Sequence, residues 1–444
     1  MLKHRQTPEE VLLDDRKLRM NLSLESLYAL YLEHPVISTD SRNLISNSIF
    51  FALKGERFDA NAFAASALDG GCRWAVVDDP NVAVDDRYIL VDDVTKCLQD
   101  LATHHRKQLT IPVIGITGSN GKTTTKELVN AVLSTQFRTH ATKGNLNNHI
   151  GVPLTILSTP KDTEILIVEM GANHRGEIAE LCEISQPNFG IVTSLGKAHL
   201  EGFGSYENIV ETKTALYRSV KKNQGLVFVN NGISELMAHS EQQNRLTFGT
   251  KHADFIGSLA NNDIFVSLNY KSEIIHTQLI GEYNFSNILV ACVIGEYFKI
   301  PIEKIKFGLE AYTPSNNRSQ LVKTKFNTLI LDAYNANPTS MTAAVESFAK
   351  IESNKKFFIL GDMLELGNES LVEHQRMISL LKKLKLHEGI FVGNIFQSLS
   401  FEDVTTFENA DEAREYLKKQ VFNDYTILIK GSRGIRLETV IDVL

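Results

Sequence analysis

The sequence predicts an α/β protein of three domains: a central P-loop-type, mostly parallel sheet, a small N-terminal α/β domain and a C-terminal doubly wound α/β domain. Three observations lead to this prediction. The chain has 444 residues, more than one hydrophobic core usually organises. Short apolar runs typical of buried strands alternate with helix-length segments along most of its length. One of these runs leads through a glycine-rich turn into a strong helical pattern.

The first predicted domain covers residues 24–110. Three short apolar runs, SIFFALKG, RWAVVDD and RYILVDD, alternate there with helical stretches, which is typical of a small α/β unit. Residues 1–23 are charged and lack the apolar stretch of a signal peptide. We expect them to form a disordered extension or a short amphipathic helix, and we assign them no function.

The central domain is predicted at residues 111–313. The run VIGIT at 113–117 precedes the glycine-rich turn, and TTTKELVNAVLSTQ after the turn has the apolar spacing of a helix. Helix-length segments separate three further strand-like runs, EILIVEM (164–170), FGIVTSL (189–195) and GLVFVN (225–230). This order predicts a mostly parallel sheet with helices on both faces.

The C-terminal domain is predicted at residues 314–444. The composition of Thr313-Pro314-Ser315-Asn316-Asn317 predicts a linker. After it, apolar strand-like runs alternate again with helix-length segments, and these runs are TLILDAY, KFFILGD, GIFVG and YTILIKGS. We expect these four runs to form a doubly wound sheet. A linker between two such domains also predicts a cleft and a hinge.

Composition narrows the class of function. The 46 basic and 53 acidic residues give a net charge of −7 without a basic stripe, which argues against a nucleic-acid partner. Cys72, Cys97, Cys182 and Cys292 form no CxxC pair, so they predict neither a zinc site nor a disulfide framework, and they suit a reducing compartment. The chain contains no run of eighteen apolar residues, so we expect no membrane insertion. We expect a cytoplasmic monomer that acts on small molecules.

The segment GITGSNGKTTTK is the strongest local signal. Its glycines let backbone amides turn toward an anion, while Lys122 supplies a point charge and Thr123 a hydroxyl for Mg²⁺. The form is T-G-x-x-G-K-T, because Ile116 stands where the usual P-loop has its first glycine. A nucleoside triphosphate is the expected ligand. The predicted contacts are Thr117, Gly118, Ser119, Asn120, Gly121, Lys122, Thr123 and Thr124.

Two polar side chains follow other predicted strands. Glu169 ends EILIVEM and His199 follows FGIVTSL, so both should emerge at the carboxyl edge of the sheet, where ligands of open α/β sheets bind. Taken singly, such a glutamate is more often a cap and such a histidine more often structural, but the edge shared with the phosphate loop favours function. Lys213 lies on a predicted helix and, by itself, reads as a solvated lysine.

Ten ordered stretches from about Leu24 to the C-terminus resemble the Mur ligase family. They are STDSR (38–42), FFALKGERFDANAF (50–63), TGSNGKTTTKE (117–127), GNLNNHIGVPLT (144–155), VEMGANHRGEI (168–178), GKAHLEGFGS (196–205), GEYNFSNILVA (281–291), LDAYNANPTSM (331–341), LGDMLELG (360–367) and KGSRGIRLE (430–438). The phosphate loop alone indicates only the broader group of Mur ligases and folylpolyglutamate synthetases. GNLNNHIGVP, DAYNANP and GDMLELG narrow the resemblance to the branch that adds a dipeptide.

The resemblance implies an ATP-dependent amide-bond ligase. Such an enzyme joins D-Ala-D-Ala to UDP-MurNAc-tripeptide through an acyl phosphate and yields UDP-MurNAc-pentapeptide for peptidoglycan synthesis. The resemblance implies that Lys122 binds the β- and γ-phosphates. It also implies that Thr123 and Glu169 bind one Mg²⁺. It assigns a second Mg²⁺ to His199 together with a carbamate that CO₂ forms on Lys213. On this basis Lys122, Glu169, His199 and Lys213 are the expected catalytic residues.

The resemblance also implies nucleotide and substrate contacts. Those expected on the adenine side or from the third domain are Asn284, Asn287, Arg318, Asp332 and Asn335. Those expected for the uridine diphosphate or peptide end are Ser41, Arg42 and Lys54, and those for the sugar-peptide junction are Asn145, Asn147 and Asn148. Ser432 and Arg433 are expected to meet the carboxylate of the incoming dipeptide, because a guanidinium binds a carboxylate bidentately.

The chain departs from the family pattern at three places. Ala215 replaces an acidic residue two places after Lys213, Phe58-Asp59-Ala60-Asn61 stands where FDGH is frequent, and Tyr283 replaces a histidine.

Two alternative functions stay open: another Mur-type ligase that adds a single amino acid, and a nucleotide-gated binding protein without ligase turnover. The third residue of the tripeptide, diaminopimelate or lysine, is also open.

Overall fold

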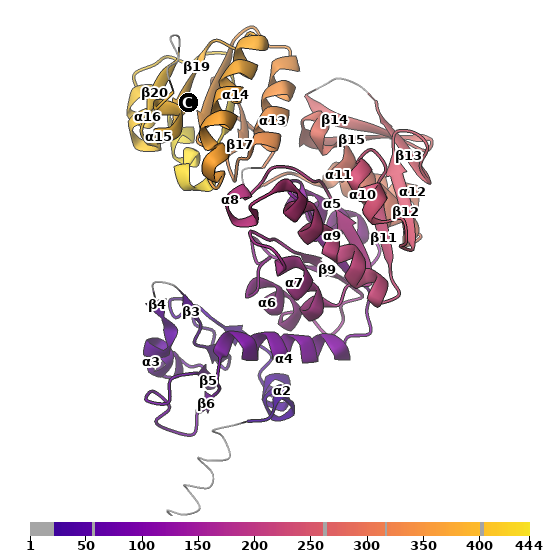
Figure 1. The fold of residues 1–444 in the computed structure, drawn as a ribbon, viewed down its shortest axis with the longest axis vertical. Coiled ribbons are helices and arrows are strands. Elements are labelled where there is room, and N and C mark those ends of the chain that lie inside the picture. The colour runs from indigo at the N-terminus through magenta and orange to yellow at the C-terminus, as the bar shows by residue number, and fades with distance from the viewer. Residues whose placement is uncertain (1–21, 56–57, 261–263, 316–317, 400–403) are drawn as a thin grey trace, which may run out of the picture.

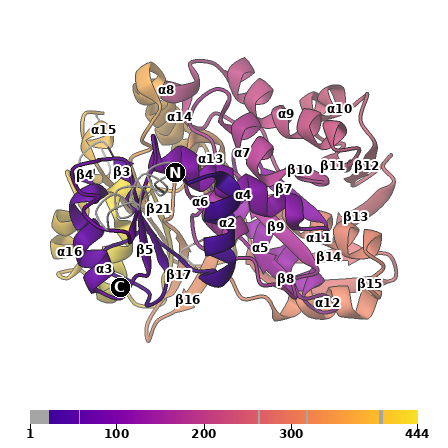
Figure 2. The ribbon, with the colours of Figure 1, turned by 90° about the horizontal axis from the view of Figure 1, so that it is seen from below.

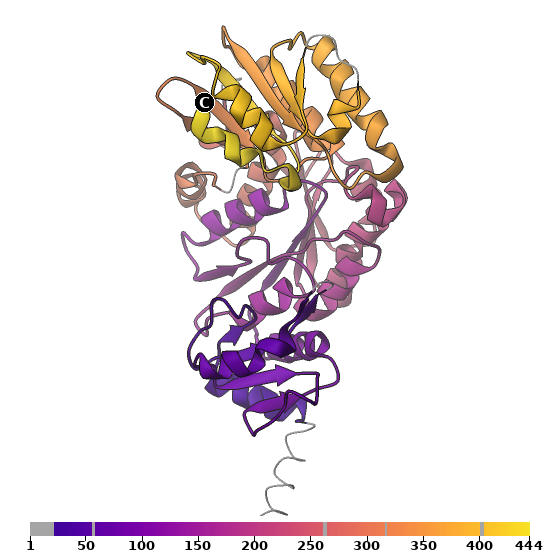
Figure 3. The same cartoon turned by 90° about the vertical axis from the view of Figure 1, so that its left-hand side faces the viewer.

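A computed structural model describes residues 22–55, 58–260, 264–315, 318–399 and 404–444. The predicted α/β fold class is confirmed, and three bodies follow one another along the long axis of the molecule (Figures 1 and 3). The N-terminal domain lies at the lower end of Figure 1 and the C-terminal domain at the upper end. The expectation for residues 1–23 falls almost entirely outside the described residues, as do Asn316 and Asn317 of the expected linker.

The N-terminal domain contains a four-stranded parallel sheet in the order β1-β2-β5-β6. Its strands are β1 (Ile37–Ser38), β2 (Ile49–Phe51), β5 (Trp74–Val77) and β6 (Tyr88–Leu90), with a small hairpin of β3 (Lys54–Gly55) and β4 (Phe58–Asp59). Its helices are α2 (Leu24–Glu33), η1 (Ala60–Phe63), α3 (Ala64–Asp69) and α4 (Val94–Gln108). Each of the three predicted apolar runs contains one strand of this sheet.

The central domain is built on a nine-stranded sheet in the order β15-β14-β13-β12-β11-β10-β7-β9-β8. Its strands are β7 (Val113–Thr117), β8 (Thr139–Ala141), β9 (Ile165–Glu169), β10 (Phe189–Val192), β11 (Leu226–Asn230), β12 (Arg245–Gly249), β13 (Phe255–Leu259), β14 (Phe265–Tyr270) and β15 (Glu273–Ile280). Its helices are α5 (Lys122–Leu133), α6 (Gly151–Leu157), α7 (Glu177–Ser185), α8 (Leu200–Phe203), α9 (Tyr206–Lys222), α10 (Ser234–His239), η2 (Glu282–Asn284), α11 (Phe285–Tyr297) and α12 (Ile302–Ala311).

Every strand predicted for the central domain is present, but the sheet extends further than the prediction. Strands β8 and β12 to β15 were not predicted, and β13, β14 and β15 pair antiparallel at one side of the domain (Figure 2). Residues 274–279 alternate between exposed and buried, but the exposed Ile274 is apolar and the buried Thr277 is polar, so the sequence does not show the same period of two.

Two helix layers cover this sheet, as the buried-strand pattern predicts. In β9, Leu166 and Val168 pack into the core under α6, α7 and α9, whereas Ile165 and Ile167 pack into the core under α5, α11 and α12. Because successive strand residues point to opposite faces, a strand buried on both faces is apolar throughout.

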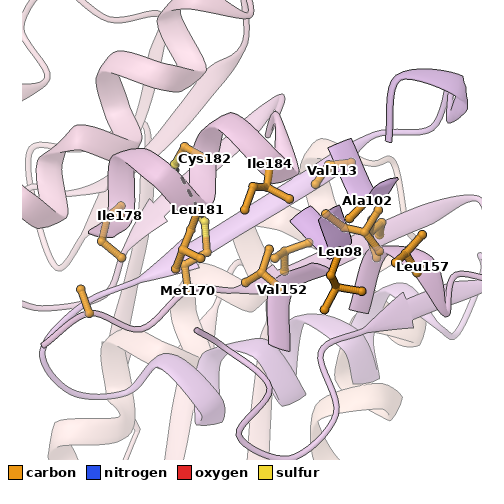
Figure 4. Packing of buried hydrophobic residues seen from close by; sticks show 14 of the residues in the cluster. Leu98, Ala102, Val113, Val152, Leu157, Met170, Ile178, Leu181, Cys182 and Ile184 are labelled. Atoms are coloured by element: carbon orange, nitrogen blue, oxygen red, sulfur yellow. Dashed lines mark hydrogen bonds between the residues drawn. The ribbon is translucent and has the colours of Figure 1, made fainter. Parts of the chain in front are cut away.

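The N-terminal and central domains share one hydrophobic core. Leu98 and Ala102 of α4 pack against the layer that contains Val152 of α6 and Leu181 of α7 (Figure 4). The buried guanidinium of Arg106 in α4 also donates to the carbonyls of Ser185 and Gln186, at 2.9 and 3.0 Å. These contacts join the two domains into one packed unit.

The C-terminal domain has a six-stranded sheet in the order β16-β17-β21-β18-β19-β20 and two core clusters of its own. Its strands are β16 (Gln320–Lys323), β17 (Thr328–Asp332), β18 (Lys356–Gly361), β19 (Gly389–Val392), β20 (Thr405–Phe407) and β21 (Thr426–Lys430), all parallel except β16. Its helices are α13 (Pro338–Lys350), η3 (Gly367–Glu369), α14 (Ser370–Lys383), α15 (Asn394–Gln397), α16 (Ala410–Leu417), η4 (Arg433–Ile435) and η5 (Leu437–Val443). Within the described ranges, no helix has the length and apolar character needed to cross a bilayer.

Candidate active site

The phosphate loop lies at the switch point of the central sheet. The chain leaves β7 for β8 and β9 on one side and then for β10 on the other, so the carboxyl ends of β9, β7 and β10 are adjacent. Gly118 and Gly121 have φ of +149° and +81°. A Cβ on Gly118 would lie 2.0 Å from the hydroxyl of Thr193, and one on Gly121 would lie 2.6 Å from the side-chain oxygen of Asn287. Both positions therefore require glycine.

Lys122 begins α5 and turns back over the loop. Its Nζ donates to the carbonyls of Gly118 at 2.8 Å and Ser119 at 3.3 Å. Burial lowers the pKa of Lys122 to about 8, an effect that the negative charge of Glu169 opposes and the positive charge of Arg318 reinforces. A phosphate group in this loop would stabilise the lysine cation.

Glu169 is the most deeply enclosed acid of the site, with 1% of its surface exposed. Its Oε1 accepts hydrogen bonds from Thr123 at 3.1 Å and from the amide of Asn147 at 2.7 Å. Its Oε2 is buried and has no hydrogen-bond partner among the described residues. A buried carboxylate oxygen without a partner is costly, so this oxygen and the Thr123 hydroxyl fit a hard divalent cation.

His199 starts the short helix α8 in a left-handed conformation, with φ of 54°. Its Nδ1 forms an ion pair with Glu365, which belongs to the C-terminal domain. The hydrogen bond from His199, followed by its charge, outweighs burial and lowers the pKa of Glu365. The histidine that follows β10 is therefore already in contact with the third domain.

Lys213 is buried in α9, with 1% of its surface exposed. The interpretation of Lys213 as a solvated lysine, made from its place on a helix alone, is therefore wrong. Its Nζ lies 5.5 Å from the centroid of the Phe203 ring, and none of the described carboxylates comes within ion-pair distance of it. Burial lowers its pKa far below the ordinary value, the charge of Lys122 adds to this effect, and Glu177 opposes it. Burial therefore favours the neutral amine over the cation.

A cavity of about 830 Å³ opens between the central and C-terminal domains. Its volume is within the usual range of small-molecule sites. Of the predicted site residues, those that line it are Ser119, Asn120, Gly121, Lys122, Thr124, Asn145, Asn147, Asn148, Glu169, His199, Asn284, Asn287, Arg318, Asp332 and Asn335. Thr117, Gly118, Thr123 and Lys213 are not among its lining residues.

The two asparagines expected on the adenine side form a chain of hydrogen bonds. Asn287 donates to Asn284 at 2.9 Å and accepts from Thr125 of α5 at 3.1 Å. Asn284 donates to the hydroxyl of Ser319 at 3.1 Å, and Tyr283 shares a hydrogen bond of 3.0 Å with the same hydroxyl. The tyrosine that replaces the family histidine therefore connects the central domain to the start of the third.

The third domain presents charged groups from the ends of β17 and β21. Asp332 and Lys430 form a buried ion pair of 2.6 Å. The guanidinium of Arg318 lies 3.7 Å from the ring centroid of Tyr334, and that of Arg433 lies 5.2 Å from the same centroid. Lys430 and Tyr334 also line the cavity, although the sequence reasoning did not name them. Both belong to stretches that carried the resemblance, LDAYNANPTSM and KGSRGIRLE, so motif membership could have indicated them.

Asn337 is a further cavity residue that the sequence reasoning missed. Its side chain exchanges hydrogen bonds with that of Asn120 in the phosphate loop, at 2.7 and 3.4 Å. It also caps α13, because its Oδ1 accepts from the amide of Ser340 at 2.9 Å. One asparagine thus connects the phosphate loop to the N-terminus of a third-domain helix.

Several predicted substrate residues lie outside this cavity. In the N-terminal domain, Ser41 is partly exposed, Arg42 pairs with Asp40 at 2.8 Å, and Lys54 pairs with Asp78 at 2.8 Å. Ser432 is buried, and its hydroxyl accepts from the amide of Leu364 at 2.9 Å. Asn148 does line the cavity, but its Oδ1 also accepts from the amides of Ile150 and Gly151 at the start of α6, at 3.1 and 2.9 Å. These hydrogen bonds give Ser432 and Asn148 structural roles of their own.

Known proteins resemble the chain over most of its length. Residues 116–295 match the Mur ligase middle domain, and residues 317–433 match the glutamate ligase domain of Mur ligases. The UDP-N-acetylmuramoyl-tripeptide–D-alanyl-D-alanine ligase of Bacillus subtilis (strain 168) is 34% identical over 91% of this chain and 92% of its own. The ligase of the same name from Escherichia coli (strain K12) is 31% identical over 92% of this chain and 93% of its own.

Two solved structures share the fold. A crystal structure of MurF from Acinetobacter baumannii superposes with a TM-score of 0.82 at 32% identity, covering 91% of this chain and 92% of that one. The MurF ligase of Thermotoga maritima in complex with ADP gives a TM-score of 0.81 at 26% identity, covering 92% of this chain and 96% of that one. The resemblance therefore extends from sequence to three-dimensional arrangement.

Proposed function

The chain belongs to the Mur ligase family, and on that basis we propose that it is the ATP-dependent ligase that joins D-Ala-D-Ala to UDP-MurNAc-tripeptide and yields UDP-MurNAc-pentapeptide for peptidoglycan synthesis. One observation carries the proposal: among the described residues, one buried oxygen of Glu169 has no partner, and it lies beside the phosphate loop in the cavity between the central and third domains. Binding ATP needs the loop, whereas transferring its phosphate also needs the charge on the phosphate oxygens to be neutralised, which a cation held by Glu169 would do.

The reaction proceeds in two steps on one precursor. The terminal carboxylate of the tripeptide attacks the γ-phosphorus of ATP, the bond to ADP breaks, and an acyl phosphate forms. The amine of D-Ala-D-Ala then attacks the acyl carbon, its proton is lost, and phosphate leaves as the amide forms. Lys122 and the amides of the phosphate loop hold the β- and γ-phosphates in line for the first step.

The proposal includes two metal ions beside the phosphate loop. When bound, Mg²⁺ supplies positive charge that neutralises the phosphate oxygens during transfer. Thr123 and Glu169 are the residues that would hold one ion, and His199 would hold the second with a carbamate on Lys213. The unpartnered oxygen of Glu169 and the hydroxyl of Thr123 support the first assignment.

The burial of Lys213 supports the carbamate. Burial lowers the pKa of Lys213 and so favours the neutral amine, which is the form that can attack CO₂, forming an N–C bond and losing one proton. The nearby charge of Lys122 repels a Lys213 cation and would attract the carbamate anion. Two residues after Lys213, this chain has Ala215 where the family usually has an acidic residue. The carboxylate whose charge acts on Lys213 is instead Glu177, and it favours the Lys213 cation.

The substrate contacts form part of the same proposal. Arg433 would meet the dipeptide carboxylate, Asn145 and Asn147 the sugar-peptide junction, and Ser41, Arg42 and Lys54 the uridine diphosphate end. Arg433 stacks near Tyr334 of the cavity wall, which supports the first of these roles. All four cysteines are free thiols, which supports a cytoplasmic location.

The test is phosphate release from ATP and Mg²⁺ with UDP-MurNAc-tripeptide, with and without D-Ala-D-Ala, followed by mass spectrometry of the product. Both the diaminopimelate and the lysine tripeptides are used. Release that depends on the dipeptide, together with a UDP-MurNAc-pentapeptide mass, is the expected result. Release that responds instead to a single amino acid would move the protein to another branch of the family. No release with any acceptor would leave only nucleotide binding.

A further inference from the structure

The loop that carries His199 touches the C-terminal domain through charged side chains. Lys197 Nζ lies 3.1 Å from Glu373 Oε1 and 4.0 Å from Glu369 Oε2. Two residues later, His199 pairs with Glu365, and the amide of Glu201 donates to the Glu365 carbonyl at 3.4 Å. Residues 196–202 are therefore held by an acidic segment, Glu365 to Glu373, that reaches them from another domain.

Glu373 differs from the other acids of this segment in its burial. Its side chain is 7% exposed, against 51% for Glu369 and 54% for Glu365. Its carboxylate lies between Lys197 of the central domain and Arg376 of its own helix. A buried carboxylate depends on its partners far more than a surface one does, so separating the domains would leave Glu373 with only one cation.

The other side of the same loop is anchored to the phosphate loop. Ser119 Oγ donates to the Gly196 carbonyl at 2.9 Å and accepts from the Gly196 amide at 3.0 Å. Between this anchor and Glu373, the backbone of His199 adopts a left-handed conformation, with φ of 54°. Residues other than glycine are uncommon in this conformation, so contacts around them usually stabilise it. The contacts at Lys197 and His199 supply such stabilisation from the C-terminal side.

We propose that Glu373 is a positioning residue for the ligase reaction, acting through Lys197. It fixes residues 196–202, and with them the imidazole of His199, only when the C-terminal domain is docked. Domain docking and completion of the phosphate-transfer site are then one event. This inference rests on the proposed function only for the role of His199 in catalysis, because the ion pair and the ordering of the loop belong to the fold itself.

The test combines a charge swap with a matched control. The variants are Glu373→Gln, Lys197→Glu and the charge swap Lys197→Glu/Glu373→Lys, which is combined with Arg376→Met so that the new lysine does not face the Arg376 guanidinium. The control is Lys350→Met, which removes another ion pair between the same two domains, Lys350 to Glu282 at 2.6 Å, in an exposed place. Thermal unfolding first establishes that every variant is folded.

Two measurements give the outcome. In steady-state kinetics, Glu373→Gln and Lys197→Glu should lower kcat by about 10- to 100-fold, the swap should recover at least about tenfold over Lys197→Glu, and Lys350→Met should stay within about twofold. Hydrogen exchange by mass spectrometry should show faster exchange at residues 196–202 in Glu373→Gln but not in Lys350→Met.

Three results would overturn the inference. The first is unchanged hydrogen exchange at residues 196–202 in Glu373→Gln. The second is a kcat of the charge swap no higher than that of Lys197→Glu, and the third is a loss of kcat in Lys350→Met equal to that in Glu373→Gln. Exchange does not require turnover, so the proposed function and this inference can fail separately. A chain without ligase activity in which residues 196–202 still respond to Glu373→Gln would keep the positioning role and lose the reaction.

Discussion

At the residue scale, three ionisable side chains lie where water is largely excluded. Among the described residues, one oxygen of Glu169 has no hydrogen-bond partner, and burial lowers the pKa of both Lys122 and Lys213. Each arrangement costs folding free energy, and perturbed ionisable groups of this kind concentrate at functional sites. Each therefore gives a prediction that a single substitution can test.

Glu169→Gln should abolish turnover while leaving the fold intact. The amide keeps the size of the side chain but replaces an anionic oxygen by a donor, so it offers no charge to a divalent cation. We expect kcat to fall by about 100-fold or more at saturating ATP, with a higher Mg²⁺ requirement. Titrating Mg²⁺ in the phosphate-release assay measures both. Activity near that of the unmodified chain would remove Glu169 from the metal site.

ATP affinity should weaken above about pH 8 because of Lys122. Its pKa is lowered to about 8, so the side chain is protonated below that pH and loses its charge as the pH rises through it. Phosphate binds the cation, so the Kd for ATP should rise by up to about tenfold per pH unit above this point. Calorimetry from about pH 7 to 9.5 measures the slope. Lys122→Arg stays charged throughout and should give a flat profile; a slope retained in that variant would assign the titration to another group.

Lys213→Ala should lower turnover by orders of magnitude, and added bicarbonate should not restore it. The reason is that alanine has no amine to carry the carbamate. Labelling with ¹³C-bicarbonate followed by NMR should give a carbamate signal in the unmodified protein that is missing from the variant. Full activity of Lys213→Ala, or a signal that persists in it, would contradict the assignment.

At the scale of elements, the N-terminus of α13 has two functions. Asn337 forms a capping box with Ser340 and also holds the side chain of Asn120 in the phosphate loop. The helix therefore begins where its first turn can face the nucleotide. This connection joins residues that are 217 positions apart in the chain.

Two substitutions separate these functions. Asn337→Ser keeps a capping hydroxyl but is too short to reach Asn120, so it should change the free energy of unfolding by only a few tenths of a kcal/mol and raise the KM for ATP. Asn337→Ala loses both and should cost about 1 kcal/mol in addition. Urea unfolding and steady-state kinetics measure the two effects. An unchanged KM in both variants would show that the contact with Asn120 does not serve nucleotide binding.

The elements also show where local pattern suffices. The strands that carry Glu169 and the phosphate loop are buried on both faces, so their apolar runs are continuous and the sequence predicts them. Strand β13 is largely exposed, β14 is largely buried and β15 alternates, and all three mix polar with apolar residues, so no apolar run marks them. Their assignment depends on pairing with one another, which a local pattern does not contain.

At the scale of the whole molecule, the cores indicate which domain moves. The N-terminal and central domains share one apolar cluster and the hydrogen bonds of Arg106, whereas the C-terminal domain has separate cores. Apart from Ile280, the buried residues of these C-terminal clusters come from the third domain. The contacts of the third domain with the central domain are instead polar, which suits a surface that opens and closes.

A scattering experiment tests this division. Addition of a non-hydrolysable ATP analogue with Mg²⁺ and UDP-MurNAc-tripeptide should reduce the radius of gyration, because the C-terminal domain closes on the cavity. Hydrogen exchange at α4 and at its partners α6 and α7 should stay unchanged, since that interface is a core. Loss of protection there on ligand binding would show that the N-terminal domain moves as well.

The sequence by itself determined the fold class, the phosphate loop and the strand end at which Glu169 lies. These follow from hydrophobic periodicity and from glycine spacing, which act between neighbours in the chain. Its resemblance to a family added roles for Lys213, Arg318 and Arg433 that no local pattern could supply.

Only the tertiary structure decided which groups meet and which are buried. It placed Lys213 in the interior, left one oxygen of Glu169 without a partner, and joined the domains at Asn120 with Asn337 and at Lys197 with Glu373. The physical reason is that burial and ion pairing depend on residues brought together from distant parts of the chain. Their free energies are properties of the packed domains, and a single segment does not encode them.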